Sequence, residues 1–91
     1  MEEDEIVEFP IDGVLDLHTF QPKDVEPLVR DYLDECRKRD ILEVRIIHGK
    51  GIGTLREIVH STLKKIEYVE DFRLAGEQSG SWGATLVWLR G

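Results

Sequence analysis

One segment constrains this chain more than any other: an apolar strand pattern that runs directly into a glycine-rich turn and a helix start. Val44–Ile47 has the apolar, β-rich composition of a buried strand, and His48–Gly53 (His-Gly-Lys-Gly-Ile-Gly) follows at once. Thr54–Glu57 (Thr-Leu-Arg-Glu) then forms a capping-box pattern, which predicts that a helix begins at Thr54. An imidazole, an ammonium group and free backbone N–H groups therefore meet at one strand-to-helix turn. This combination predicts an anion site, and phosphate is the anion it favours.

The rest of the chain alternates between strand and helix patterns. We expect strands and helices in the order β-α-β-α-β-β, at about Val14–His18, Asp24–Arg39, Glu43–His48, Thr54–Lys65, Val69–Ala75 and Ala84–Leu89. Pro27 agrees with the first helix if that helix starts near Asp24, because the first turn has no N–H bond to lose. Strands joined by right-handed helical crossovers are parallel, and two crossovers that step the same way place both helices on one face. The predicted fold class is an α/β (α+β) two-layer sandwich with one sheet face partly open.

Size and composition limit the class of protein. The 91 residues are enough for one domain, which we place at residues 11–91 after an acidic lead-in at residues 1–10. No apolar run approaches the roughly 18 to 20 residues that a membrane helix needs, and the acidic N-terminus does not resemble a targeting peptide. A single cysteine, Cys36, excludes an internal disulfide and lies on the apolar face of the first helix, so we interpret it as core. We therefore expect a cytoplasmic protein with no membrane partner, and the sequence leaves its oligomeric state open.

The charge distribution bears on nucleic-acid binding. The net charge of −7 argues against such a partner at first sight. Residues 1–43, however, contain 14 acidic and 5 basic residues, a charge of −9, whereas residues 44–91 contain 5 acidic and 7 basic residues, a charge of +2. Arg45, Lys50 and Arg56 occur within residues 44–56 without an acidic neighbour. Because salt screens charges beyond about 8 to 10 Å, the local positive charge of this segment matters more for binding than the net charge of the chain. Nucleic acid is therefore the expected partner.

Two histidines are candidate catalytic groups. Asp16 and His18 are two residues apart on a strand, so their side chains share a face, and the carboxylate would fix the tautomer of the imidazole. The alternative is a structural Asp–His pair that closes the strand end. Neighbouring parallel strands present their C-terminal ends at the same edge, so we expect His18 and His48 to share that edge. Strand parity alone does not show that both rings point at the same spot.

The glycine turn supplies the candidate phosphate contacts. Gly49, Gly51 and Gly53 permit positive φ and close approach of a phosphate to the backbone, and the alternative is a tight turn with no ligand. Lys50 within the turn and Arg56 just beyond it favour phosphate.

Three ring-bearing residues elsewhere invite interpretation. We expect His60 to lie at the surface, on the flank of the apolar stripe of the second helix, and Trp88 to lie in the core. Trp82 would either cover the core or stack on a base.

Three ordered motifs carry a family resemblance over about residues 12–90. Asp16-Leu17-His18, His48-Gly49-Lys50-Gly51-x-Gly53-x-Leu55-Arg56 and Gly80-Ser81-Trp82-Gly83-Ala84-Thr85 resemble the small MutS-related (Smr) domain family. The resemblance implies a fold like the C-terminal domain of translation initiation factor three, with a four-stranded mixed sheet of order 1-2-4-3 and an antiparallel fourth strand. It also implies nucleic-acid binding and, in several members, nicking endonuclease or ribonuclease activity. The roles proposed for the family motifs would fall on Asp16, His18, His48, Gly49, Lys50 and Gly51.

One departure from the family concerns the first motif, which commonly continues with glycine after the histidine. Here Thr19 and Phe20 follow His18. A side chain at this place would narrow access to His18, or add a hydroxyl contact and a ring that stacks on a base.

The predicted function is an Smr-like, nucleic-acid-binding endonuclease that nicks or cleaves DNA or RNA phosphodiesters; the alternative is a binding module for nucleic acid or ribonucleoprotein without turnover. For RNA, the 2′-OH would attack the phosphate with one histidine as base and the other as acid, and no metal or other cofactor would be needed. For DNA, water must attack, and Mg²⁺ or Mn²⁺ becomes expected. Asp16 is the only carboxylate near the motif, which favours RNA cleavage without a metal site. The candidate catalytic residues are Asp16, His18 and His48, and the candidate phosphate or nucleic-acid contacts are Arg45, Gly49, Lys50, Gly51, Gly53, Arg56 and Trp82.

Overall fold

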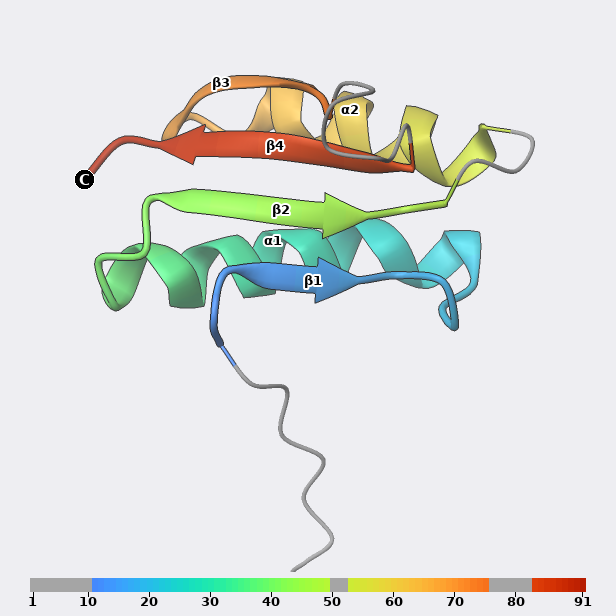
Figure 1. Ribbon diagram of the computed structural model, residues 1–91, viewed down its shortest axis with the longest axis horizontal. Helices are drawn as coiled ribbons and strands as arrows, with labels where there is room; N and C mark the ends of the chain where they lie inside the picture. The colour runs from blue at the N-terminus through green and yellow to red at the C-terminus, as the bar shows by residue number, and fades with distance from the viewer. Residues whose placement is uncertain (1–10, 50–52, 76–82) are drawn as a thin grey trace, which may run out of the picture.

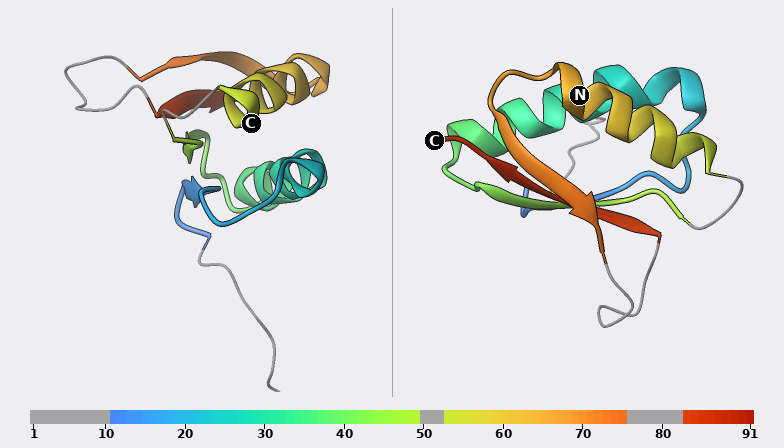
Figure 2. Two further views of the ribbon diagram at one scale, coloured as in Figure 1. Left: turned by 90° about the vertical axis from the view of Figure 1, so that its right-hand side faces the viewer. Right: turned by 90° about the horizontal axis from the view of Figure 1, so that it is seen from above.

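The protein folds as one four-stranded sheet with two helices packed on one of its faces (Figures 1 and 2). A computed structural model describes residues 11–49, 53–75 and 83–91. Its elements are β1 (Val14–Asp16), α1 (Pro22–Lys38), β2 (Glu43–Ile47), α2 (Thr54–Lys65), β3 (Val69–Leu74) and β4 (Ala84–Leu89). The sheet order is β1-β2-β4-β3, in which β1 and β2 are parallel and β4 is antiparallel to both of its neighbours. The predicted fold class, strand order and strand directions are confirmed.

Alternation along the strands decides which residues form the core. Leu15 lies opposite Ile46, and Val44 lies opposite Val87, and these side chains are buried under the helices. Helix α1 contributes Val25, Val29, Leu33 and Cys36 to the same cluster, and α2 contributes Val59 and Leu63. Cys36 is fully buried, as its place on the apolar face predicts.

The expectation that Trp88 belongs to the core is wrong. Trp88 lies opposite Glu43, one residue past the Val44–Val87 pair, so the pleat turns it to the face that the helices leave uncovered. It is half-buried there, with the Arg73 guanidinium 5.1 Å from the centre of its ring. A β-rich strand packed on one face buries only alternate residues, and the register selects which ones.

Helix α1 begins two residues earlier than predicted. Pro22 is its first residue, a position where the fixed φ of proline suits a helix and no N–H bond is lost. The premise that Pro27 must lie in the first turn was therefore wrong, since Pro27 lies inside the helix. Of the described residues, none belong to a helix with the length and apolarity needed to cross a membrane.

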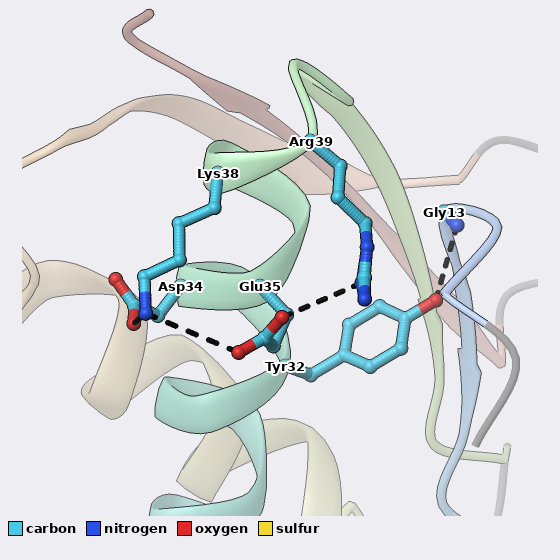
Figure 3. A network of polar contacts seen from close by, with 6 residues as sticks. All are labelled: Gly13, Tyr32, Asp34, Glu35, Lys38 and Arg39. Carbon is cyan, nitrogen blue, oxygen red and sulfur yellow. Dashed lines mark hydrogen bonds and ion pairs between the residues drawn. The ribbon is translucent and has the colours of Figure 1, made fainter. Parts of the chain in front are cut away.

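A buried hydroxyl ties α1 to the start of β1 (Figure 3). The Tyr32 Oη accepts a hydrogen bond of 3.0 Å from the Gly13 N–H and donates one of 3.1 Å to the Val14 carbonyl. Gly13 has φ +92°, a left-handed conformation that favours glycine. An exposed ion pair between Glu35 and Arg39 (3.4 Å) lies beside this contact. The Tyr32 contact therefore helps to fix the path of β1, the strand that carries Asp16.

Candidate phosphate-binding and catalytic site

Asp16 and His18 form a hydrogen-bonded pair at the end of β1. The Asp16 Oδ1 accepts a 3.0 Å hydrogen bond from the His18 backbone N–H and lies 2.7 Å from the His18 Nδ1. These bonds, the backbone one first, hold the pKa of the Asp16 carboxyl below its usual value. An ionised carboxylate only accepts hydrogen bonds, so the His18 Nδ1 carries the hydrogen. In the neutral ring the Nε2 then carries no hydrogen and can accept a proton. The His18 side chain is 69% exposed and the Asp16 side chain is 49% exposed, so this Nε2 is open to a substrate.

His48, at the end of β2, is buried instead of open. The residue is 5% exposed, its Nδ1 is 3.1 Å from the Gly49 carbonyl oxygen, and its Nε2 is 2.8 Å from the Thr85 Oγ1. The backbone N–H groups of His48 and Gly49 both donate to the Gly83 carbonyl, at 2.7 and 2.8 Å. Burial lowers the pKa of His48, which favours the neutral ring. Both ring nitrogens of His48 are thus engaged, whereas in His18 only the Nδ1 has a hydrogen-bond partner among the described residues.

A hollow of about 290 Å³ lies between the end of β2 and the beginning of α2. It is lined by Phe20, Pro22, His48, Gly49, Gly53, Thr54, Leu55 and Arg56. We call it the phosphate hollow, after the ligand that the sequence predicts for this turn. A helix N-terminus and an arginine at one concave place give it a positive potential.

The start of α2 differs in detail from a capping box. Thr54 is the first helical residue, as predicted, but the N-cap is Gly53, and no side chain caps this end. The N-cap backbone is left-handed, with φ +87°, which is why glycine stands there and a capping threonine does not. Among the described residues, the first N–H groups of α2 therefore have no capping side chain, which favours an anion at this end.

Arg56 folds back over the N-cap. A Cβ added to Gly53 would lie only 2.7 Å from the Arg56 Nη2, so the missing side chain makes room for the guanidinium. Two constraints thus favour glycine at position 53: the left-handed backbone conformation and the space that the Arg56 side chain occupies.

The Asp16–His18 pair borders a second hollow, not the phosphate hollow. This hollow, of about 280 Å³, is lined by Val14, Leu15, Asp16, His18, Thr19, Phe20 and Tyr32. His18 and His48 therefore line different hollows, and Phe20 lines both. Asp16 lies opposite Ile47 and faces the uncovered side, while His48, one residue farther along, turns toward the helices.

The expectation that His60 is a surface residue is wrong. It is half-buried, and its Nε2 lies 2.8 Å from the Thr85 Oγ1, the same atom that contacts His48. Its ring stands edge-on to His48, with 6.2 Å between ring centres, and lies 5.0 Å from the ring of Phe72. One signal for this contact was present in the sequence: Thr85 shares strand parity with Val87, so a hydroxyl faces the core and needs a partner.

The comparisons with known proteins agree with this architecture. A model of the Smr domain family matches residues 15–90. This chain belongs to the Smr domain family. It is 37% identical over 76 residues to Endonuclease MutS2 of Carboxydothermus hydrogenoformans, which covers 84% of this chain and 10% of that protein. It is 44% identical over 61 residues to Endonuclease MutS2 of Lachnoclostridium phytofermentans, covering 67% of this chain and 8% of that protein. The Smr domain of this chain thus corresponds to about a tenth of these relatives.

Solved structures place the Smr domain in the same fold. The Smr domain of Thermus thermophilus MutS2 matches with a TM-score of 0.82 and 31% identity, covering 88% of this chain and all of that one (100%). YdaL, a stand-alone small MutS-related protein from Escherichia coli, matches with a TM-score of 0.81 and 24% identity, covering 92% and 69%. The second likeness concerns the fold alone.

The remaining predicted contacts of this Smr domain are spread over the molecule. Arg45 lies opposite Val14 and Leu86 on the uncovered face of the sheet, away from the phosphate hollow. Lys50, Gly51 and Trp82 lie outside the described residues, as do residues 1–10. In the described part, the phosphate hollow therefore combines Gly49, Gly53 and Arg56 with His48.

Proposed function

We propose that this Smr domain binds nucleic acid through a backbone phosphate at the phosphate hollow and cleaves the adjacent phosphodiester with the Asp16–His18 pair. The observation that carries the proposal is the 2.7 Å contact between the Asp16 Oδ1 and the His18 Nδ1, which leaves an exposed, basic Nε2. This arrangement of a base and the carboxylate that orients it is the one that activates hydroxyl groups in many enzymes. The names of the MutS2 relatives, which are endonucleases, support the same reaction class.

The binding step uses groups that carry no base specificity. The Arg56 guanidinium and the uncapped N–H groups at the start of α2 are donors for phosphate oxygens. The half-buried ring of Phe20 lies between the two hollows, where it would contact the nucleotide that joins them. Such a partner is bound by its backbone first and by base stacking second.

RNA is the substrate that the described residues are best equipped to cleave. The His18 Nε2 accepts the proton of the 2′-OH, the 2′ oxygen forms a bond to phosphorus, and the bond from phosphorus to the 5′ oxygen breaks. The leaving 5′ oxygen takes a proton from water, and the products carry 2′,3′-cyclic phosphate and 5′-OH ends. Arg56 and the helix N–H groups stabilise the charge that develops on the phosphoryl oxygens.

His48 has a supporting part in this proposal. Its ring nitrogens are engaged with Gly49 and Thr85, so we assign it to shaping the phosphate hollow instead of transferring the proton. Within the described ranges, no group of three or more His, Cys, Asp or Glu side chains is arranged to hold a metal ion. Asp16 and His18 alone are a small ligand set for a divalent ion, which is why the proposal uses the 2′-OH.

The test combines substrates and variants. A structured RNA and a supercoiled DNA are incubated with the protein, each with and without EDTA. We expect His18→Ala to reduce RNA cleavage by about 10²- to 10⁴-fold, the usual contribution of a general acid or base, with little change in affinity.

A pair of arginine variants tests binding separately. Arg56→Ala should weaken binding to all sequences equally and lower the salt slope by about 1. Arg30→Ala is the matched control, because Arg30 lies on α1 in an exposed ion pair with Glu26 and does not line the hollow. Its affinity should equal that of the wild type.

Two outcomes would replace this proposal. Loss of cleavage in EDTA, restored by Mg²⁺ or Mn²⁺, with DNA nicked in preference to RNA, would indicate a metal-dependent nickase. Binding that depends on Arg56, without turnover of either substrate, would indicate a binding module.

A further inference from the structure

Three side chains behind the phosphate hollow form one hydrogen-bonded array whose hydrogens can be assigned. The Thr85 Oγ1 is 2.8 Å from the His48 Nε2 and 2.8 Å from the His60 Nε2. At the far end, the His48 Nδ1 faces the Gly49 carbonyl at 3.1 Å. Thr85 is fully buried, so its hydroxyl depends on these two rings for its partners.

The carbonyl of Gly49 sets the direction of the whole array. A carbonyl oxygen only accepts, so the His48 Nδ1 carries a hydrogen and the Nε2 of the neutral ring is an acceptor. The Thr85 hydroxyl must then donate to His48, and its lone pair accepts from the His60 Nε2–H. The order is His60 to Thr85 to His48 to Gly49, and each histidine is restricted to one tautomer.

We infer that His60 and Thr85 are positioning residues: the Thr85 hydroxyl, which accepts from His60, donates to the His48 Nε2 and so holds this ring against the Gly49 carbonyl at the edge of the phosphate hollow. The inference extends the proposed function, on which its consequence for RNA binding rests. His60 does not line the hollow and acts only through Thr85. Gly49, the partner of His48, has φ +84°, a conformation that the His48 Nδ1–H stabilises from one side and the Gly83 carbonyl from the other.

The same geometry makes the two histidines one titrating unit. If His48 takes up a proton at its Nε2, that nitrogen becomes a donor, and the Thr85 hydroxyl must turn its hydrogen toward His60. His60 then has to present an unprotonated Nε2, so its own hydrogen moves to the Nδ1. The array therefore accommodates one proton by reversing the direction of its hydrogen bonds. A second proton would make both rings donate to the Thr85 oxygen and would place two positive charges on rings whose centres are 6.2 Å apart.

The surroundings of the rings oppose protonation as well. Burial lowers the pKa of both histidines, and the charges that act on them are cationic: His48 itself on His60, Arg56 on both rings, and Lys64 on His60. Phe72 of β3, whose ring also packs against His60, is uncharged. A phosphate in the hollow would offset the Arg56 charge, so uptake of a proton and binding of RNA should favour each other.

The experiment reads the tautomers directly, without any substrate. Nitrogen-15 NMR of the imidazole side chains distinguishes the protonated from the unprotonated ring nitrogen for each histidine. In the wild type we expect His48 as the Nδ1–H tautomer and His60 as the Nε2–H tautomer. Thr85→Ser keeps the hydroxyl and should preserve both, whereas Thr85→Val removes the acceptor of the His60 Nε2–H and should leave His60 as a mixture of tautomers, with His48 still restricted by the Gly49 carbonyl.

A second pair of variants tests His60 separately. His60→Gln keeps a donor near the position of the Nε2, and His60→Leu removes it while keeping an apolar side chain against Phe72. We expect His48 to keep its tautomer in both variants, because the Gly49 carbonyl sets it, and the Nε2 resonance of His48 to shift only in His60→Leu, where the Thr85 hydroxyl loses the donor that orients it. Binding of a short single-stranded RNA should weaken about three- to tenfold in Thr85→Val and His60→Leu, the effect of one hydrogen bond, and less than about twofold in the conservative variants.

The outcomes separate this inference from the proposed function. An Nε2–H tautomer at His48 or an Nδ1–H tautomer at His60 in the wild type would overturn the inference, as would the same spectra in Thr85→Val and Thr85→Ser. The expected spectra together with an RNA that fails to bind the wild type would support the array and refute the proposed function alone.

Discussion

Gly53→Ala separates the two reasons for which glycine stands at the N-cap of α2. The first reason is the backbone: φ is +87°, and an L-residue in this region costs about 1–2 kcal/mol. The second reason is space, because the new Cβ would lie 2.7 Å from the Nη2 and 3.3 Å from the Cζ of Arg56. The end of a flexible side chain moves at little cost in stability, so the contact affects binding more than folding.

The magnitudes follow from these two terms. The free energy of unfolding should fall by about 1–2 kcal/mol, and for a domain of this size each 1 kcal/mol lowers the Tm by roughly 4–8 °C. Displacing Arg56 should remove part of a charge-assisted contact with phosphate. About 1 kcal/mol of that contact corresponds to about a fivefold loss of affinity for RNA.

Gly49→Ala is the matched control for the backbone term. Gly49 has a φ of +84°, but a Cβ there meets nothing within 4 Å. We expect a similar loss of stability and a smaller loss of affinity. A double-mutant cycle then isolates the spatial term: on an Arg56→Ala background, Gly53→Ala should cost little further affinity, because the group it displaces is already gone.

Urea unfolding and equilibrium binding to a short RNA at fixed ionic strength measure the two quantities. An equal loss of affinity from Gly53→Ala with and without Arg56 would refute the spatial requirement at this position. An unchanged free energy of unfolding in Gly53→Ala would refute the backbone requirement.

Two further predictions concern the buried polar groups. Tyr32→Phe should lower the free energy of unfolding by about 1–2 kcal/mol, because the buried N–H of Gly13 loses its acceptor. Tyr68→Phe is the control: the Tyr68 hydroxyl has no hydrogen-bond partner among the described residues, so this variant should stay within about 0.5 kcal/mol of the wild type in the same urea titrations. Equal losses in the two variants would contradict this prediction. The folded-state pKa values of His48 and His60 are lowered, so the unfolded chain binds more protons than the folded one near pH 6.5. Their contribution to stability should be fully present above that pH and decline as the pH falls below it. Unfolding measured from pH 8 to 5 checks this, and a rise in stability toward pH 5 would contradict it.

Local patterns in the sequence determined most of the architecture. The alternation and composition of residues 84–89 predict β4, and the apolar spacing between Thr54 and Lys65 predicts α2, both with the observed bounds. These patterns depend on which face of an element is apolar, and neighbours along the chain define that face. The ordered motifs that resemble the Smr domain family added the strand order and the antiparallel direction of the fourth strand, which residue spacing alone does not provide.

Only the tertiary structure decided which side chains distant in the sequence meet. Asp16 and His18 contact each other because they are two residues apart, so the sequence could anticipate this pair. The distribution of His18 and His48 over two hollows depends on where Phe20 packs and on which way each strand end turns.

The array behind the phosphate hollow is a second case of this kind. His60 and Thr85 are 25 residues apart, and their contact requires that α2 lie over β4 in one particular register. Side-chain direction at a strand end, and contacts between a helix and a sheet, follow from register and packing among distant segments. Periodicity within one segment carries no information about them.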